Sequence, residues 1–231
     1  MIRYVLPFLL FLILVYIFLF SPIFKIRAIE VSGNQEIEIA EIINKFDYQN
    51  IFLSTEKKIK TSLMGKIPQI LDLDVSKNLI KRIVKLIIRE REKAGIVCQA
   101  DKCFFVDNKG IIFEEAPQTS GSLILLIKDY SQRTLELGKE IFNEDLMGSV
   151  LEIRNDLDAE MDIKTLSFDI STYPLKELKL VTNEGWYVLF DAERDLKSQL
   201  RVLGAALKEK IQNRKGLEYI DLRIENRIYY K

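Results

Sequence analysis

The chain has 231 residues, with 34 acidic and 34 basic side chains and a sequence pI near 6.5. This balance argues against nucleic acid or a polybasic lipid contact as the main partner, since both need a strong cationic excess. The absence of histidine excludes Ser-His-Asp, Cys-His and histidine-ligated zinc chemistry, and two cysteines cannot form an all-thiolate zinc site.

The first element in the chain is an uncharged apolar run from Tyr4 to Phe20, which extends through Ile23. Crossing a bilayer takes about 20 apolar residues. The run therefore predicts a transmembrane helix over residues 4–23, preceded by a short tail, residues 1–3, that would be cytoplasmic. A cleaved signal peptide is the alternative, but its apolar region is shorter and ends at a small-x-small site, which is missing here.

Residues 24–92 carry the signals of a compact unit with the order β-α-α-β-β. We expect a strand at 24–31, a short helix whose buried face carries Ile39, Ile43 and Phe46, and a second helix that begins after the N-cap Thr55. Alternating polar and apolar residues predict strands at 71–76 and 82–90. Two helices would then pack on one face of a small sheet.

Residues 93–231 predict a larger mixed α/β unit. A leucine stripe with helical spacing marks the clearest helix, at 193–211. The full set comprises helices at 141–157 and 193–211 and strands at 94–99, 102–106, 111–113, 123–127, 166–171, 177–181, 186–190 and 219–229. The last strand, Tyr219–Tyr229, is long and alternates as a half-buried strand does. At a sheet edge it would expose unpaired N–H and C=O groups that can pair with another chain.

Cys98 and Cys103 flank a predicted two-residue hairpin loop, Ala100-Asp101, which would place them opposite one another. They are a candidate disulfide if the unit lies outside the cytoplasm, and two reduced apolar side chains otherwise. We favour the disulfide.

Three other features have a functional and a structural interpretation. Glu114 and Glu115 are adjacent on a strand and point to opposite faces, so they cannot flank one glycosidic bond. Ser21 and Ser32 lack the surroundings of a membrane-anchored Ser/Lys peptidase. Trp186 could bind a sugar or a partner, but we favour a core or rim position.

In their order, these segments resemble the FtsQ/DivIB cell-division family over essentially the whole chain. The resemblance rests on the following short motifs: Phe24-x-Ile26-x-x-Ile29-x-Val31-x-Gly33, Ile88-x-Glu90-Arg91, Val106-Asp107-x-x-Gly110-x-x-Phe113, Asn183-Glu184-Gly185-Trp186, the leucine-striped helix and Tyr219-Ile220-Asp221-Leu222-Arg223. It implies an α+β fold with a POTRA domain at residues 24–92 and a β-domain at 93–231 that ends in a long C-terminal strand.

The resemblance also implies a function. Such a protein is a non-enzymatic, single-pass (type II) scaffold of the divisome at the division septum, with no cofactor and with its domains outside the cytoplasmic membrane. It recruits FtsB/DivIC-like and FtsL-like coiled-coil proteins by strand pairing. The partner-facing residues implied here are Tyr219, Asp221, Arg223, Ile224, Asn226 and Arg227. The alternative is a POTRA-type periplasmic chaperone or docking protein for polypeptide transport.

Overall fold

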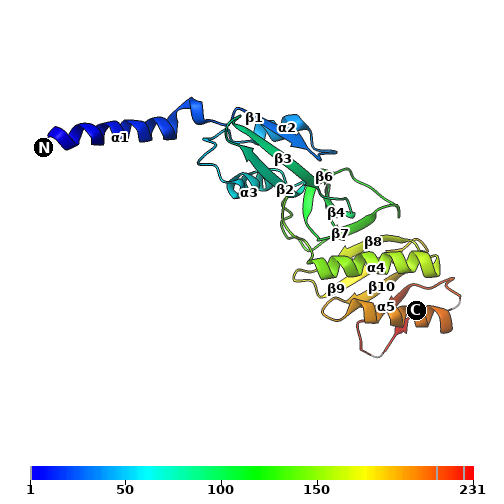
Figure 1. Ribbon diagram of the computed structural model, residues 1–231. Helices are drawn as coiled ribbons and strands as arrows, with labels where there is room; N and C mark the ends of the chain where they lie inside the picture. The colour runs from blue at the N-terminus through cyan, green and yellow to red at the C-terminus, as the bar shows by residue number, and fades with distance from the viewer. Residues whose placement is uncertain (1, 212, 226) are drawn as a thin grey trace. The chain divides into compact units, whose positions relative to one another are not determined.

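The computed structural model describes residues 2–211, 213–225 and 227–231, with side chains described from residue 7 onward. The chain forms two compact units, Met1–Arg91 and Glu92–Lys231, each with helices and its own sheet (Figure 1). The expected α+β class is therefore confirmed.

The first unit is built around a small three-stranded sheet. The strand order is β1-β3-β2, with β1 parallel and β2 antiparallel to the central β3. Its elements are α1 (Ile2–Phe20), the 3-10 helix η1 (Pro22–Phe24), β1 (Ala28–Ser32), α2 (Ile39–Lys45), α3 (Glu56–Lys66), β2 (Ile70–Asn78) and β3 (Ile83–Glu90). Its core is formed by isoleucine, leucine, valine and phenylalanine side chains from the two shorter helices and the sheet.

Local sequence explains how α3 begins, but it misplaces the buried face of α2. The Thr55 side chain accepts a hydrogen bond from the Lys58 N–H at 3.2 Å, which is the expected N-cap. In α2 the buried side chain is Ile42, whereas Ile39 and Ile43 are exposed. With only seven residues, α2 turns a single narrow stripe to the core, and Ile42 with Phe46 forms that stripe.

The predicted transmembrane helix at residues 4–23 is wrong. No helix in the described part of the chain has both the length and the apolar character needed to cross a bilayer. Helix α1 ends at Phe20, because Ser21 precedes a proline and takes an extended conformation with φ −65° and ψ 136°. Residues 22–24 then form a separate 3-10 turn instead of continuing the helix.

In its described residues, the second unit is a sheet of nine strands with two helices packed against it. Its elements are β4 (Gly95–Gln99), β5 (Lys102–Val106), β6 (Ile112–Ala116), β7 (Leu125–Asp129), α4 (Glu144–Met161), β8 (Thr165–Ile170), β9 (Glu177–Thr182), β10 (Tyr187–Asp191), α5 (Leu196–Glu209), β11 (Tyr219–Asp221) and β12 (Tyr229–Tyr230). The strand order is β12-β11-β10-β9-β8-β7-β4-β5-β6.

Helices α4 and α5 lie side by side along the sheet (Figure 1), and their apolar stripes form the main core with one face of it. Asn143 caps α4 by accepting from the Leu146 N–H, and Asp195 caps α5 by accepting from two N–H groups. Trp186 is fully buried in this core, and its Nε1–H donates to Glu184 at 2.8 Å. The core interpretation of Trp186 is confirmed.

The predicted long C-terminal strand is also wrong. β11 covers Tyr219–Asp221 only, the chain then leaves the sheet, and it returns as the short antiparallel strand β12. The apolar alternation continues through Ile224, but Ile224 is exposed and makes no strand pair. The edge of the sheet is therefore β12 and not the strand that contains Tyr219.

The core on α5 can be tested with two neighbouring residues. Leu203 is fully buried under the sheet, whereas Val202 is 42% exposed. We expect Leu203→Ala to lower the free energy of unfolding by about 2–5 kcal/mol, because it leaves a cavity in a closed core. Val202→Ala should change it by less than about 0.5 kcal/mol. Amide hydrogen exchange in β9 and β10 measures both effects, and equal effects would contradict this packing.

Candidate partner-binding site

The C-terminal segment joins the sheet through β11, which runs parallel to β10. Ile220 and Leu222 are buried on the helix-covered face of the sheet. The Leu222 N–H donates to the Leu189 carbonyl at 2.9 Å, so main-chain contact with β10 continues one residue beyond the strand. Burial of these two side chains fixes which face of β11 points to the core and which points outward.

Two polar contacts end β11. The Asp221 side chain accepts from the Arg223 N–H at 3.0 Å, the two-residue reach typical of an Asx turn. The Arg194 guanidinium donates to the Leu222 carbonyl at 2.6 Å and so occupies an acceptor that a longer strand would need. The chain is thereby turned away from the sheet after Leu222.

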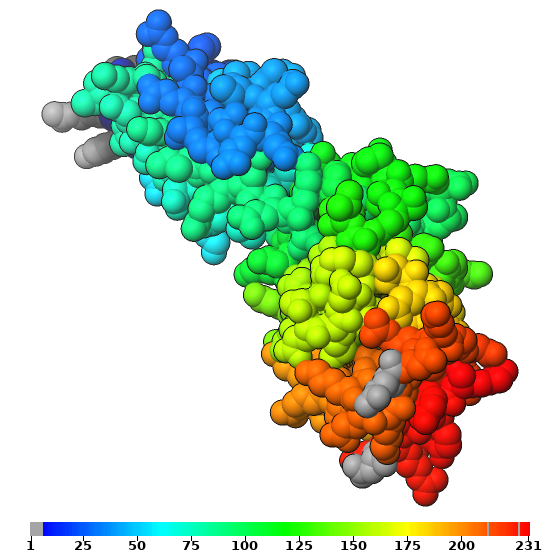
Figure 2. All heavy atoms as spheres, turned by 90° about the vertical axis from the view of Figure 1, so that its right-hand side faces the viewer, coloured from blue at the N-terminus to red at the C-terminus, as the bar shows by residue number. Residues whose placement is uncertain are grey.

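Strand β12 forms the open edge of the sheet. It pairs Tyr229 with Asp221 and Tyr230 with Ile220, while Lys231 and Tyr219 exchange main-chain hydrogen bonds of 3.2 and 3.4 Å. Hydrogen-bonded pairs alternate along an antiparallel ladder, so the N–H and C=O of Tyr230 point away from β11. Figure 2 shows these last residues, in red, at the surface of the second unit.

An ionic network lies beside this edge. Arg223 donates to Asp221 at 2.7 and 3.0 Å and to Glu177 on β9 at 2.7 Å. The hydrogen bond from Arg223 keeps the pKa of Asp221 below its ordinary value, against the opposing effect of partial burial. The same contact raises the pKa of Arg223, so the guanidinium stays protonated.

A pair of tyrosines forms the outer surface next to the network. The rings of Tyr187 on β10 and Tyr219 on β11 stack with centroids 5.8 Å apart, and Lys179 lies 4.1 Å above the Tyr187 ring. Aromatic pairs and cation–π contacts are common anchors in protein interfaces. Together with the edge, this surface offers both main-chain and side-chain contacts to a partner.

The structure divides the predicted partner residues between two settings. Tyr219 and Asp221 lie on β11, whereas Arg223, Ile224 and Arg227 lie in the segment between β11 and β12. Asn226 lies outside the described residues. Ile224 and Arg227 line a small cavity of about 130 Å³ beside α5, and the Arg227 guanidinium contacts the Tyr229 hydroxyl at 3.4 Å. The described residues of the predicted set therefore lie around the edge of the sheet and do not form one strand.

The predicted set omitted the main-chain edge at Tyr230 and the stacking partner Tyr187. The polar run Glu225-Asn226-Arg227, followed by the apolar and aromatic residues Ile228, Tyr229 and Tyr230, is the sequence signal of a turn and a second strand. No sequence pattern marks Tyr187, because its stacking depends on the register of β10 with β11.

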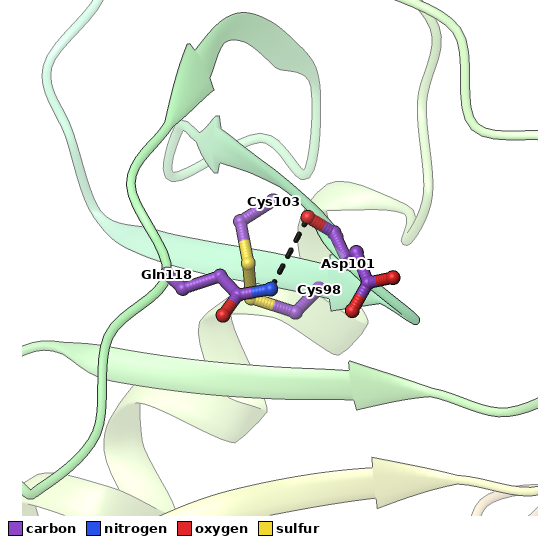
Figure 3. The surroundings of a disulfide bond; sticks show 4 residues. All are labelled: Cys98, Asp101, Cys103 and Gln118. Carbon is purple, nitrogen blue, oxygen red and sulfur yellow. Dashed lines mark hydrogen bonds between the residues drawn. A yellow bond between two sulfur atoms is a disulfide. The ribbon is translucent and has the colours of Figure 1, made fainter.

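Cys98 and Cys103 form a disulfide across the β4–β5 hairpin, where they are direct register partners. Ala100 begins the intervening turn with φ +51°, and the Gln118 side chain donates to the Asp101 carbonyl at 3.3 Å (Figure 3). The bond closes one wall of a cavity of about 360 Å³ that Lys128 and Tyr130 also line. In the strand order, the disulfide-linked strands β4 and β5 lie next to the edge strand β6, far from β12.

Within the described residues, no cluster of three or more His, Cys, Asp or Glu side chains could hold a metal ion. The polar groups gathered near β12 are ion-paired or hydrogen-bonded to one another.

Comparison with known proteins points to cell division. No protein-family profile matches the chain. It is 22% identical over 208 residues to the cell division protein DivIB of Clostridium tetani, covering 87% of this chain and 77% of that protein. It is 24% identical over 224 residues to DivIB of Clostridium acetobutylicum, covering 94% and 87%. These similarities over most of the chain support the FtsQ/DivIB family and a role in cell division.

The link between Arg223 and Asp221 predicts an acid-sensitive edge. Because the pKa of Asp221 is depressed in the folded state, its stabilisation is complete above the unfolded value near 3.9 and is lost as the pH falls through the folded value. Arg223→Met should move the pKa of Asp221 upward, as followed by carboxyl NMR titration. Arg227→Met, a matched control outside this network, should leave it in place. Equal titration in both variants would contradict the assignment.

The Cys98–Cys103 bond should stabilise the second unit modestly. In the loop-entropy model, closing a ring this small lowers the entropy of the unfolded chain and so stabilises the folded unit by about 2 kcal/mol. The double variant Cys98→Ser, Cys103→Ser should therefore have a free energy of unfolding lower by about 2 kcal/mol, measured as a lower denaturant midpoint. Adding a reductant to the native protein should reproduce the loss, whereas the same reductant should not affect the double variant. If reductant left the stability of the native protein unchanged, the stabilising role of the Cys98–Cys103 disulfide would be contradicted.

Proposed function

We propose that this protein is a non-enzymatic scaffold of the bacterial divisome that recruits FtsB/DivIC-like and FtsL-like coiled-coil proteins at the septum. The proposed contact is strand addition at β12. The similarity to DivIB supports the division role, and the outward-facing main chain of Tyr230 is the observation that carries the binding mode.

The edge alone is too small to hold a partner. Specific complexes bury about 1,200 Å² or more in total, and a strand of two residues provides a small part of that. The exposed side chains of Tyr229 and Tyr230 and the stacked Tyr187–Tyr219 pair would supply further contact area. We therefore assign main-chain pairing the role of setting the partner's register and the tyrosines the role of anchors.

For the first unit we propose the POTRA fold and a spacing or docking role. The order β1-α2-α3-β2-β3, with the last strand central in the sheet, supports this assignment. The Cys98–Cys103 disulfide supports a place outside the cytoplasm, where such bonds persist. A POTRA-type chaperone for transported polypeptides is the second candidate, since strand β2 also has a free edge.

Replacing Tyr230 by proline tests the binding mode. Proline removes the outward N–H but leaves the inward ladder bonds of Tyr229 and Lys231, so the second unit should stay folded. We expect binding of the purified extracytoplasmic segment of the DivIC-like partner to weaken about tenfold or more in calorimetry. A fluorescent fusion of the native chain should mark the constriction site, and the proline variant should be displaced from it.

Tyr230→Ala is the matched control, because it removes the side chain and keeps the N–H. It should bind more tightly than Tyr230→Pro. Equal affinity of the proline variant and the native chain would refute strand addition at β12. Even labelling of the whole envelope by the native fusion would favour the chaperone.

A further inference from the structure

Three segments of the first unit meet at the end where β1 begins. β1 starts beside Ile83, so it begins next to the turn at 79–82 that joins β2 to β3. The loop at 51–54 lies at the same end, because Lys77 at the end of β2 donates to the carbonyls of Ile51 and Ser54 at 3.2 and 2.7 Å. The Arg82 guanidinium donates to the Ile23 carbonyl at 2.7 Å.

This end of the unit exposes large apolar side chains on all three segments. Ile80 is 95% exposed and Ile23 is 67% exposed, and Phe52, Leu53 and Leu79 are each more than 40% exposed. Single exposed apolar residues need no explanation, but a group of five at one end of a small unit is typical of a binding surface.

One of these exposed residues, Phe52, is held in place by neighbouring aromatic rings. Phe24 and Phe52 pack together with Phe18 at the end of α1, with ring centroids 5.3 to 5.8 Å apart. Asn50 is buried and donates from Nδ2 to the Phe18 carbonyl at 2.6 Å. The loop that carries Phe52 is therefore held against the end of α1.

Charge is strongly segregated here although the chain as a whole is neutral. The segments 18–27, 48–58 and 77–82 contain seven cationic residues and a single carboxylate, Glu56. The cations are Lys25, Arg27, Lys57, Lys58, Lys77, Lys81 and Arg82. The balanced total of 34 acidic and 34 basic residues conceals this patch.

We infer that this end of the first unit docks on the surface of a bilayer that contains anionic lipids. Exposed leucine, isoleucine and phenylalanine side chains on the same segments as lysine and arginine match the chemistry of an interfacial site, where apolar groups enter the headgroup region and cations contact lipid phosphates. A protein partner fits less well, because lysine is depleted in protein interfaces and five of the seven cations are lysine. The contact is separate from the proposed strand addition at β12.

Fluorescent probes at single sites test the docking in the full chain. Leu53→Cys and Ile80→Cys place an NBD label on two tips, and Gln35→Cys is the control at the far end of the sheet, where the Gln35 N–H contacts Glu90. The native cysteines are bonded to each other, so the introduced thiol reacts alone. A label at Phe11→Cys, on an exposed residue of α1, reports binding by the helix itself.

With vesicles containing phosphatidylglycerol, we expect the emission at positions 53 and 80 to shift to the blue and to gain intensity, while position 35 stays unchanged. Vesicles of phosphatidylcholine alone, or high salt, should reduce the shift, since cations near an anionic surface are screened. Lys81→Glu should reduce it further at position 80.

The inference is overturned if positions 53 and 80 keep the emission seen in water, whether position 11 shifts or not. A shift at position 11 alone would mean that α1 binds lipid while this end stays free for another partner. An equal shift with neutral and anionic vesicles would remove the role of the cations and would also refute the proposal as stated. None of these outcomes depends on partner binding at β12.

Discussion

The apolar layer between helices α4 and α5 and one face of the nine-stranded sheet determines the rest of the second unit. Ile220 and Leu222 belong to that layer, so Tyr219 and Asp221 must point to the opposite face. From this orientation follow the stacking of Tyr219 on Tyr187 and the reach of Arg223 to Glu177 on β9. The composition of the proposed partner-binding surface therefore follows from which residues of β11 are buried in the core.

Periodic patterns in the sequence were sufficient where burial alone decides the structure. The leucine stripe located α5, and the alternation of Ile220 and Leu222 located β11. Where β11 ends could not be found in this way, because Ile224 continues the apolar pattern. The chain leaves the sheet on account of the Asp221 turn and the capture of the Leu222 carbonyl by Arg194, a residue 28 positions earlier.

The same limit applies to the candidate site and to the N-terminal region. Tyr219 and Asp221 could be placed near the edge from sequence, but the exposed main chain of Tyr230 depends on a strand that returns from a turn. Near the N-terminus, composition suggested one continuous helix, whereas the conformation of Ser21 before Pro22 ended it. In α2, the choice between Ile42 and its neighbours depended on packing against α3 and the sheet.

The position of the single tryptophan has an experimental consequence. Trp186 is the only one in the chain, and it lies fully buried in the core of the second unit. Tryptophan fluorescence therefore reports the unfolding of the second unit and does not report that of the first. A denaturation curve recorded by fluorescence and one recorded by circular dichroism should separate if the two cores melt independently, and their difference would give the stability of the first unit without dividing the chain.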